Sequence, residues 1–183
     1  MARVPYVDQD DLPPEYRDEL VLTSNVSRAL ANSPSACRAS GGMARYIRHE
    51  NGLDPRLREM AIIQVGYLTG AAYEYTHHIA YGFEFGVTED DVRAIADETA
   101  GRETALATLD KAVLRGAREM TAGLAMSAET FAELQAGLGN EHLIELILAV
   151  GNYNGVVRML ATLEVDLEDD YQDYLKRFPL AAG

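Results

Sequence analysis

The chain has 183 residues, of which 48% are hydrophobic and 25% are charged, and this composition is typical of one folded domain rather than of a disordered chain. Its 29 acidic and 16 basic residues give a formal net charge of −13, which argues against nucleic acid and an anionic membrane surface as partners. The single cysteine, Cys37, excludes an intramolecular disulfide and a metal cluster held by cysteines.

The segments that most often carry a targeting or membrane signal lack its features here. The first eleven residues have no apolar core of the kind found in a signal peptide. The longest weakly polar stretch, Ala61 to Ala72, is interrupted by Gln64 and is too short to cross a bilayer. We therefore expect a cytoplasmic protein in which residues 1–183 form a single domain and the partner is a small molecule.

The N-terminal part of the chain predicts an extended lead-in followed by two helices. Residues 1–14 are rich in proline and are expected to pack on the surface or on a neighbouring subunit. A first helix is predicted from about Glu15 to Ala31. A second is predicted from about Ser35 to Glu50, where Asn51 and Gly52 end it. Cys37 closes a loop-like segment that begins at Asn32, and we expect it to be a plain free thiol.

The next two predicted helices contain the most apolar sequence in the chain. Asp54 and Pro55 form a helix N-cap and first position, and the residues from Leu57 to Leu68 are apolar on almost every face. Such a helix is buried all round, either in the core or at a subunit contact. After Thr69-Gly70 the helix continues or restarts, and it runs from Ala71 to Phe85 before Gly86 ends it.

The rest of the chain is also predicted to be helical. Thr88 and Asp91 resemble a capping box that opens a helix ending near Thr99, and further helices are expected at 103–122, 127–137 and 140–163. The six carboxylates between Glu164 and Tyr174 are typical of a solvated helix face. Because no stretch alternates with period two, the sequence predicts a compact all-α fold of about six to eight helices.

The residues that suggest chemistry lie between Ala71 and Gly86. Glu74 and His78 are four residues apart on a predicted helix, so their side chains are neighbours on one otherwise apolar face, and His77 flanks it. Burial raises the pKa of a carboxylate, whereas an adjacent imidazolium lowers it. The pair is therefore predicted to titrate near neutrality, which suits proton transfer.

A second carboxylate, Glu59, lies in the middle of the preceding buried helix, where an unpaired charge is costly. Two other readings stay open. Glu74 and His78 can form a purely structural ion pair, with Glu59 paired to a nearby arginine. The spacing Glu74-x-x-His77 also occurs in di-iron bundles, but a second copy is absent, and a mononuclear metal site from these four side chains is not favoured. We expect neither a metal nor an organic cofactor.

Three segments taken in order resemble the carboxymuconolactone decarboxylase and alkylhydroperoxidase D-like family, and a fourth resembles its second half. The resemblance covers about residues 40–170 and implies a compact, alkylhydroperoxidase D-like helical subunit that assembles into a homo-oligomer, a trimer or a hexamer. The four segments are Arg58-Glu-Met-Ala-Ile-Ile, Gly70-Ala-Ala-Tyr-Glu-Tyr-Thr-His-His, Phe85-Gly-Val-Thr-Glu-Asp-Asp-Val and Leu143-Ile-Glu-Leu-Ile-Leu-Ala-Val-Gly-Asn-Tyr-Asn-Gly-Val-Val.

The sequence departs from the peroxidase branch of this family. Those members carry Cys-x-x-Cys, then three residues and a histidine, with a glutamate upstream. Counting back from His78, the two cysteine positions are occupied by Glu74 and Ala71, while Glu59 stands at the upstream glutamate. Cys37 lies in a different segment and cannot replace them. Because a dithiol peroxidase needs a nucleophilic thiolate and a resolving partner, thiol peroxidase activity is not expected.

The resemblance instead implies the decarboxylase branch, whose members act without a metal or an organic cofactor. It suggests a lyase that decarboxylates or isomerises a small unsaturated carboxylic acid or lactone. His78 is the expected acid/base, Glu74 its partner, and Glu59 a second acid/base or orienting group. His77 and Tyr75 are candidates for substrate contact.

Two questions remain open from the sequence. An anionic substrate needs a cationic anchor, and spacing does not choose among the five candidate arginines. The chain could also be a non-catalytic helical oligomer or a metal- or redox-dependent relative of the decarboxylases. The arginines in question are Arg45, Arg48, Arg56, Arg58 and Arg158.

Overall fold

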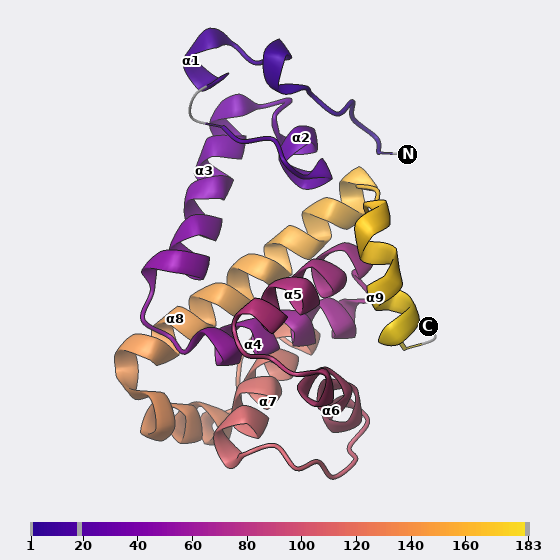
Figure 1. Cartoon of the computed structure of the whole chain (residues 1–183). Helices are drawn as coiled ribbons and strands as arrows, with labels where there is room; N and C mark the ends of the chain where they lie inside the picture. The colour runs from indigo at the N-terminus through magenta and orange to yellow at the C-terminus, as the bar shows by residue number, and fades with distance from the viewer. Residues whose placement is uncertain (1, 18–19, 182–183) are drawn as a thin grey trace.

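In the computed structural model, which describes residues 2–17 and 20–181, every regular element is helical (Figure 1). This confirms the prediction of an all-α fold, and nine α-helices lie in the described ranges because some predicted helices are divided. The elements are η1 (Gln9–Asp11), α1 (Pro14–Arg17), α2 (Asn25–Leu30), α3 (Pro34–Arg45), the π-helical turn η2 (Tyr46–Glu50), α4 (Pro55–Thr69), α5 (Ala72–Glu84), α6 (Glu89–Thr99), α7 (Thr108–Ala122), α8 (Ala128–Leu163), η3 (Asp169–Tyr171) and α9 (Gln172–Arg177).

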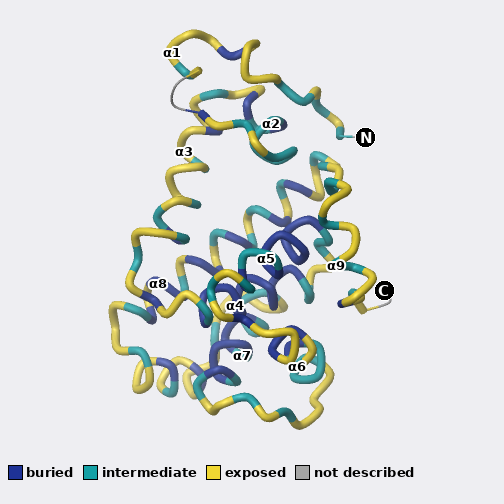
Figure 2. The backbone as a smooth tube through the Cα atoms, in the orientation of Figure 1, coloured by how far each residue is buried: buried dark blue, intermediate teal, exposed yellow. Residues whose placement is uncertain are grey.

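Helix α4 is the centre of the bundle. It begins at Pro55, where the Asp54 side chain accepts a hydrogen bond from the Leu57 N–H at 3.0 Å. All ten residues from Leu57 to Gly66 are buried, and α5, α6, α7 and α8 pack around them. Figure 2 shows buried backbone gathered in this central region around α4 and α5. The prediction of a helix buried on every face is confirmed.

The turn after α4 fixes how α5 packs against it. Gly70 adopts the left-handed conformation with φ of 65° and ends α4, so the chain restarts as α5 rather than continuing. The two helices then approach backbone to backbone, since a Cβ added at Gly66 would lie only 2.8 Å from the Tyr75 amide nitrogen. This close packing places Glu59 of α4 opposite His78 of α5.

The helices α1, α2 and α3 form an N-terminal arm that extends from the rest of the bundle (Figure 1). The arm has a small apolar cluster of its own, which includes Leu12 and Leu20. The prediction of a single helix from Glu15 to Ala31 is wrong, because this range is divided between α1 and α2. Ser24 is extended, with φ of −134° and ψ of 156°, and forms a capping box with Ser27 at the start of α2. These serine side chains bond the backbone locally, and so favour a new helix start over an uninterrupted helix.

Helix α3 begins at Pro34, so Cys37 lies in a helical turn rather than in the expected loop. The thiol is buried, and its Sγ lies 3.6 Å from the carbonyl oxygen of Ser27. Burial raises the pKa of the Cys37 thiol, which keeps it protonated at neutral pH. Through η2 the helical path of α3 ends at Glu50, as predicted.

The remaining helices agree with the sequence except at their ends. The capping box of Thr88 and Asp91 opens α6, which confirms that prediction. Helix α7 begins at Thr108 and not near residue 103, because the backbone of Ala107 is extended, with φ of −63° and ψ of 157°. The break predicted between 137 and 140 is a kink at Gly139, with φ of 74°, within α8.

The N-terminal segment packs on the C-terminal end of α8 and on the residues that follow it. The Arg3 N–H donates to the Leu163 carbonyl at 2.8 Å, and the Tyr6 hydroxyl is 3.0 Å from a carboxylate oxygen of Asp166. The residues after α8 are therefore not only a solvated face, as the run of carboxylates had suggested. Asp166 and Glu168 lie in an extended segment before η3, where their side chains bond other parts of the chain.

One helix in the described part of the chain, α8, is long and apolar enough to cross a membrane by length and composition alone. It packs against α4 and α7, which shows how a core helix can pass the same criterion. Its outer face carries the exposed apolar side chains of Ile144 and Leu148.

The close approach of α4 and α5 makes a direct test of the fold. Substituting Gly66→Ala places a methyl group against the backbone of Tyr75, and we expect it to lower the free energy of unfolding by about 1–3 kcal/mol. Gly151→Ala, at an exposed position of α8, is the control, because a Cβ there meets nothing within 4 Å and the change should be neutral or stabilising by up to about 1 kcal/mol. Urea unfolding measures both, and equal stability of the two variants would contradict this packing.

Candidate active site

A cavity of about 900 Å³ lies between the N-terminal arm and the body of the bundle. Its walls come from α2, α3 and η2 of the arm side and from α5 and α8 of the body. Glu74, His77 and His78 of α5 line it together with Tyr153 of α8. The histidine and glutamate side chains singled out in α5 therefore face a space large enough for a small organic molecule.

His78 is held between two glutamates. Its Nδ1 lies 2.6 Å from the Oε2 of Glu59 and its Nε2 lies 3.2 Å from the Oε2 of Glu74. The other oxygen of Glu59 accepts a hydrogen bond from the Arg58 Nε at 3.0 Å. The structure thus brings the three predicted acid/base residues together. Glu59, and not Glu74, is the closer partner of the imidazole.

A buried row of alternating charge runs through four side chains: Arg58, Glu59, His78 and Glu74. Burial alone would lower the pKa of His78, but the charges and hydrogen bonds of Glu59 and Glu74 raise it to about 9. Burial alone would raise the pKa of Glu59, but the positive charges of His78 and Arg58 hold it below its ordinary value. At neutral pH His78 is therefore an imidazolium and Glu59 a carboxylate. The pKa of His78 is thus higher than the near-neutral value expected from the sequence.

Two tyrosines hold the ring of His78 from the side of the cavity. The Tyr153 ring meets it edge-on at 4.6 Å between centres, and the Tyr81 ring does so at 5.6 Å. Burial raises the pKa of the Tyr153 phenol, so the group remains a proton donor. Sequence reasoning missed Tyr153, because it lies 75 positions from His78 with no chemical motif around it.

His77 is fixed in a different way from its neighbour. Its Nδ1 donates to the Tyr73 carbonyl at 2.8 Å, and its Nε2 lies 3.3 Å from the Oε2 of Glu168. The ring is stacked between Tyr73 and Tyr171, with ring centres 4.1 and 3.7 Å away. Burial lowers the pKa of His77, although the neighbouring carboxylates oppose the effect. His77 lines the cavity as a neutral, immobilised ring.

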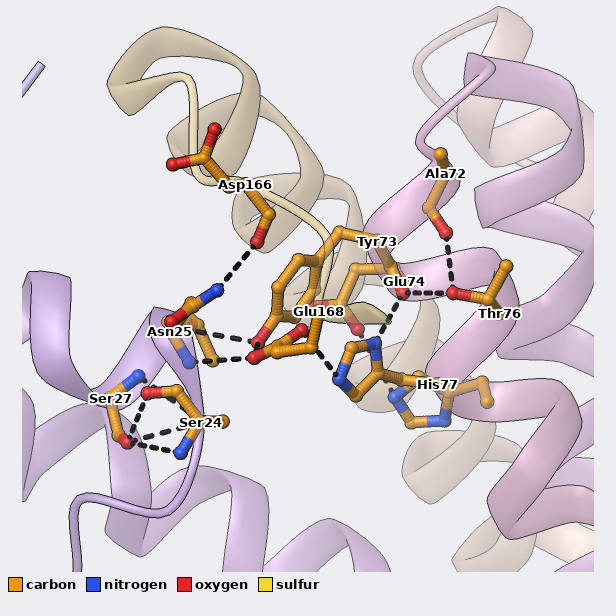
Figure 3. Close-up of polar contacts among 12 residues, drawn as sticks. Ser24, Asn25, Ser27, Ala72, Tyr73, Glu74, Thr76, His77, Asp166 and Glu168 are labelled. Atoms are coloured by element: carbon orange, nitrogen blue, oxygen red, sulfur yellow. Dashed lines mark hydrogen bonds and ion pairs between the residues drawn. The ribbon is translucent and has the colours of Figure 1, made fainter. Parts of the chain in front are cut away.

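Glu168 connects three parts of the chain beside the cavity (Figure 3). One of its oxygens accepts hydrogen bonds from the Tyr73 hydroxyl at 2.8 Å and from the Asn25 N–H at 2.7 Å. The residue thereby joins the segment after α8 to α5 and to the start of α2 in the arm. No local pattern indicates this role, since Glu168 stands in a run of similar acidic residues such as Asp169 and Asp170.

Comparison with known proteins identifies the family. The sequence model of the carboxymuconolactone decarboxylase family matches residues 34–126, slightly more than half of the chain. The chain belongs to the carboxymuconolactone decarboxylase family. No curated protein matches it.

Several solved structures have the same fold, and each aligns with almost the whole of this chain. An uncharacterized peroxidase-related protein from Ralstonia eutropha JMP134, described as an alkylhydroperoxidase AhpD core, has a TM-score of 0.80 at 18% identity over 93% of this chain and 94% of its own. A peroxidase-related protein from Silicibacter sp. TM1040 has a TM-score of 0.76 at 17% identity over 92% of both chains. These similarities confirm the AhpD-like fold.

A third similar structure contains a ligand. It is a cysteine-to-alanine variant of the debrominase Bmp8 in complex with 2,3,4-tribromopyrrole, with a TM-score of 0.81 at 18% identity over 97% of this chain and 98% of its own. The family and its fold therefore include proteins named for decarboxylation, for peroxidase-related chemistry and for debromination.

Tyr75 does not lie where substrate contact was expected in this decarboxylase family member. It is 2% exposed and packs in the core with Met60, Ile63 and Ile79, and it does not line the cavity. The adjacent positions Glu74 and Tyr75 point to different sides of α5, because successive residues of a helix are about 100° apart.

The structure also separates the five arginines considered as anchors for an anion. Arg45 and Arg48 line the cavity. The other three are engaged outside it: Arg56 with Asp91 and Asp110, Arg58 with Glu59, and Arg158 with Asn154.

In residues 2–17 and 20–181, no group of three or more His, Cys, Asp or Glu side chains is arranged to hold a metal ion. His78 has both ring nitrogens directed at carboxylates, and His77 has its Nδ1 bonded to the Tyr73 carbonyl and its Nε2 3.3 Å from Glu168. What the geometry offers is a cation poised between two acids, which is an arrangement for moving protons.

The buried pair of His78 and Glu59 predicts how stability depends on pH. Since the pKa of His78 is raised from 6.5 to about 9, its contribution is complete below pH 6.5 and is lost as pH rises through 9. Since the pKa of Glu59 is lowered from 4.5, its contribution is complete above pH 4.5 and is lost as pH falls further. Between pH 6.5 and 9 the free energy of unfolding should fall by roughly 3 kcal/mol.

Urea unfolding at pH values across this window measures the fall. His142→Gln is the matched control, because His142 pairs with Glu145 outside the cavity and its loss should leave the pH dependence in place. A wild-type free energy that stays constant between pH 6.5 and 9 would contradict a buried imidazolium.

Proposed function

We propose that this protein is a cofactor-independent acid/base enzyme that decarboxylates or isomerises a small unsaturated carboxylic acid or lactone. The observation that carries the proposal is the cationic His78, held between Glu59 and Glu74 in the wall of a cavity of about 900 Å³. A cation placed in a buried site stabilises negative charge that develops on a substrate oxygen. Membership of the carboxymuconolactone decarboxylase family supports the same reaction class.

In decarboxylation, the bond between the carboxylate carbon and its neighbour breaks and carbon dioxide leaves. The electron pair of that bond passes into the conjugated carbonyl group and forms an enolate. The Nε2–H of His78, which faces Glu74 at 3.2 Å, is placed to hydrogen-bond the enolate oxygen. A proton then moves from His78 to carbon, directly or through Glu74, and solvent returns the proton to the imidazole.

Glu59 acts on this step through His78 and is a positioning residue. Its bond to Nδ1 keeps the imidazole doubly protonated and fixes the direction of Nε2–H toward the cavity. Arg58 in turn holds the second oxygen of Glu59 and keeps that carboxylate charged. Isomerisation uses the same residues, with Glu74 taking a proton from one carbon and returning it to another.

Thiol chemistry is not part of the proposal, although two similar structures are named as peroxidase-related and one as a debrominase. The cysteine positions of the peroxidase motif hold Glu74 and Ala71 here. The only cysteine of the chain, Cys37, lies in α3 with a raised thiol pKa and has no second thiol to pair with.

The expected setting of the enzyme also stays a proposal. We propose a cytoplasmic homo-oligomer, a trimer or a hexamer, that acts on a small molecule. The exposed side chains of Ile144, at 61%, and Leu148, at 36%, support self-association along α8, because water-exposed apolar side chains on one helix face favour a partner surface.

The proposed function predicts the effect of removing the central imidazole. With γ-carboxymuconolactone as the first substrate tested, we expect His78→Gln to lower kcat by about 100-fold or more, because the proton donor is lost. Glu74→Gln should lower it less, and His142→Gln, outside the cavity, should not change it. The wild-type kcat should fall as pH rises through about 9, where His78 loses its proton.

Loss of the substrate chromophore follows the reaction, and the same assay extends to other unsaturated acids and lactones. Full turnover by His78→Gln on any substrate that the wild type converts would contradict the proposal. So would a wild-type rate that rises with pH through 9, since the neutral imidazole would then be the active form.

A further inference from the structure

One arginine in the cavity wall, Arg48, forms no ion pair with a carboxylate in the described part of the chain. We propose that Arg48 is the anchor for the ligand, binding a carboxylate group side-on through its Nε and one Nη while Tyr81 holds the guanidinium in place. This inference rests on the proposed function for the choice of an unsaturated acid as ligand, but the anchor itself is argued from contacts of Arg48.

The guanidinium of Arg48 is incompletely satisfied. In the described part of the chain, its Nε is buried without a hydrogen-bond partner, and no carboxylate forms an ion pair with the side chain. A buried donor without an acceptor costs about 1–3 kcal/mol, so such groups in folded proteins call for a partner. Because Arg48 lines the cavity, a bound molecule is placed to supply the missing acceptor.

Other arginines that line the cavity are engaged by the protein itself. Arg45 forms an ion pair with Glu50 at 3.0 Å, and its side chain is 70% exposed to solvent. The guanidinium of Arg38 lies over the ring of Tyr16 at 5.3 Å. Arg48 is thus the arginine best placed to accept an anion in the cavity.

Tyr81 connects Arg48 to the acid/base residues. The guanidinium carbon of Arg48 lies 5.4 Å from the centre of the Tyr81 ring, and the same ring meets the His78 ring edge-on at 5.6 Å. Stacking on an aromatic ring uses the face of a guanidinium and leaves its in-plane N–H groups available for a carboxylate. A single small molecule beside Tyr81 can therefore reach both cations.

The backbone around Arg48 forms a π-helical turn, which is consistent with a functional role. Arg48 lies in the π-helical turn η2, where the Asn51 N–H bonds the Tyr46 carbonyl five residues back at 3.1 Å. Such turns are rare, and they occur often at functional sites because the wider turn changes the direction of a side chain relative to an α-helix. Here the turn ends α3 at the edge of the cavity.

These contacts define the class of ligand. Its carboxylate pairs with Arg48, and its flat conjugated part lies against Tyr81 and extends toward His78 and Tyr153. A planar unsaturated acid fits this arrangement, whereas its uncharged ester lacks the charge that the guanidinium needs. Arg48 is thus a specificity-determining residue that selects acids over neutral analogues and sets which end of the ligand meets His78.

Isothermal titration calorimetry with sorbate, a flat conjugated monocarboxylate, and with methyl sorbate tests the anchor on the full chain. We expect the wild type to bind sorbate more tightly than the ester, and Arg48→Gln to weaken sorbate binding by about 10-fold or more with little change for the ester. Arg48→Lys should bind sorbate with intermediate affinity, since lysine keeps the positive charge but lacks the paired N–H donors that bind both oxygens of a carboxylate.

Arg45→Gln is the matched control, because it removes the same charge from another arginine of the same cavity wall. It should change sorbate affinity by no more than about threefold, as expected for a solvent-exposed charge. Equal losses in Arg45→Gln and Arg48→Gln would overturn the proposal in favour of a general electrostatic field. Unchanged sorbate binding by Arg48→Gln would also overturn it, as would a wild type that does not prefer sorbate to the ester.

The binding experiment needs no turnover, so it separates this inference from the proposed function. Selective loss of sorbate binding in Arg48→Gln, in a protein that converts no substrate, would support the anchor and reject the enzyme. Unchanged sorbate binding in Arg48→Gln, in a protein whose activity depends on His78, would reject the anchor and leave the enzyme. A thermal unfolding curve of Arg48→Gln close to that of the wild type shows that the fold is intact.

Discussion

The structure depends on a buried row of four charges, Arg58, Glu59, His78 and Glu74, at the contact between α4 and α5. Each charge has an opposite charge beside it, which offsets the cost of removing ionised groups from water. The row requires two helices in close contact, and the absence of a Cβ at the buried Gly66 permits it. Because the outer end of the row meets the cavity, the same interaction that closes the core also presents a proton to a ligand.

The rest of the molecule forms the walls of the cavity beside His78. The N-terminal arm forms one wall of the cavity, and α5 with α8 forms the other. Glu168 ties the segment after α8 to both walls through Tyr73 and Asn25, so distant parts of the sequence meet beside the site. His77 is held neutral by burial, while the adjacent His78 is cationic. Two histidines in sequence thus have different charges because their partners differ.

The sequence was sufficient for the fold class and for the residues on one helix. The apolar run of α4 and the four-residue spacing of Glu74 and His78 are local sequence patterns, so they can be recognised without knowledge of the tertiary structure. The roles of Tyr153 and Glu168 depend on contacts across long sequence separations, and no local pattern marks them. Tyr75 was misplaced because its neighbours in sequence face the cavity while its own direction on α5 faces the core.

The most direct test of a buried imidazolium is the titration of His78 itself. NMR of ring-labelled histidines, followed from below pH 6.5 to above pH 9, gives its pKa once the resonance is assigned by its absence in His78→Gln. The account predicts a midpoint near 9 and a doubly protonated ring at neutral pH. A midpoint at or below 6.5 would mean that Glu59 and Glu74 do not hold a cation between them, and would contradict the mechanism built on it.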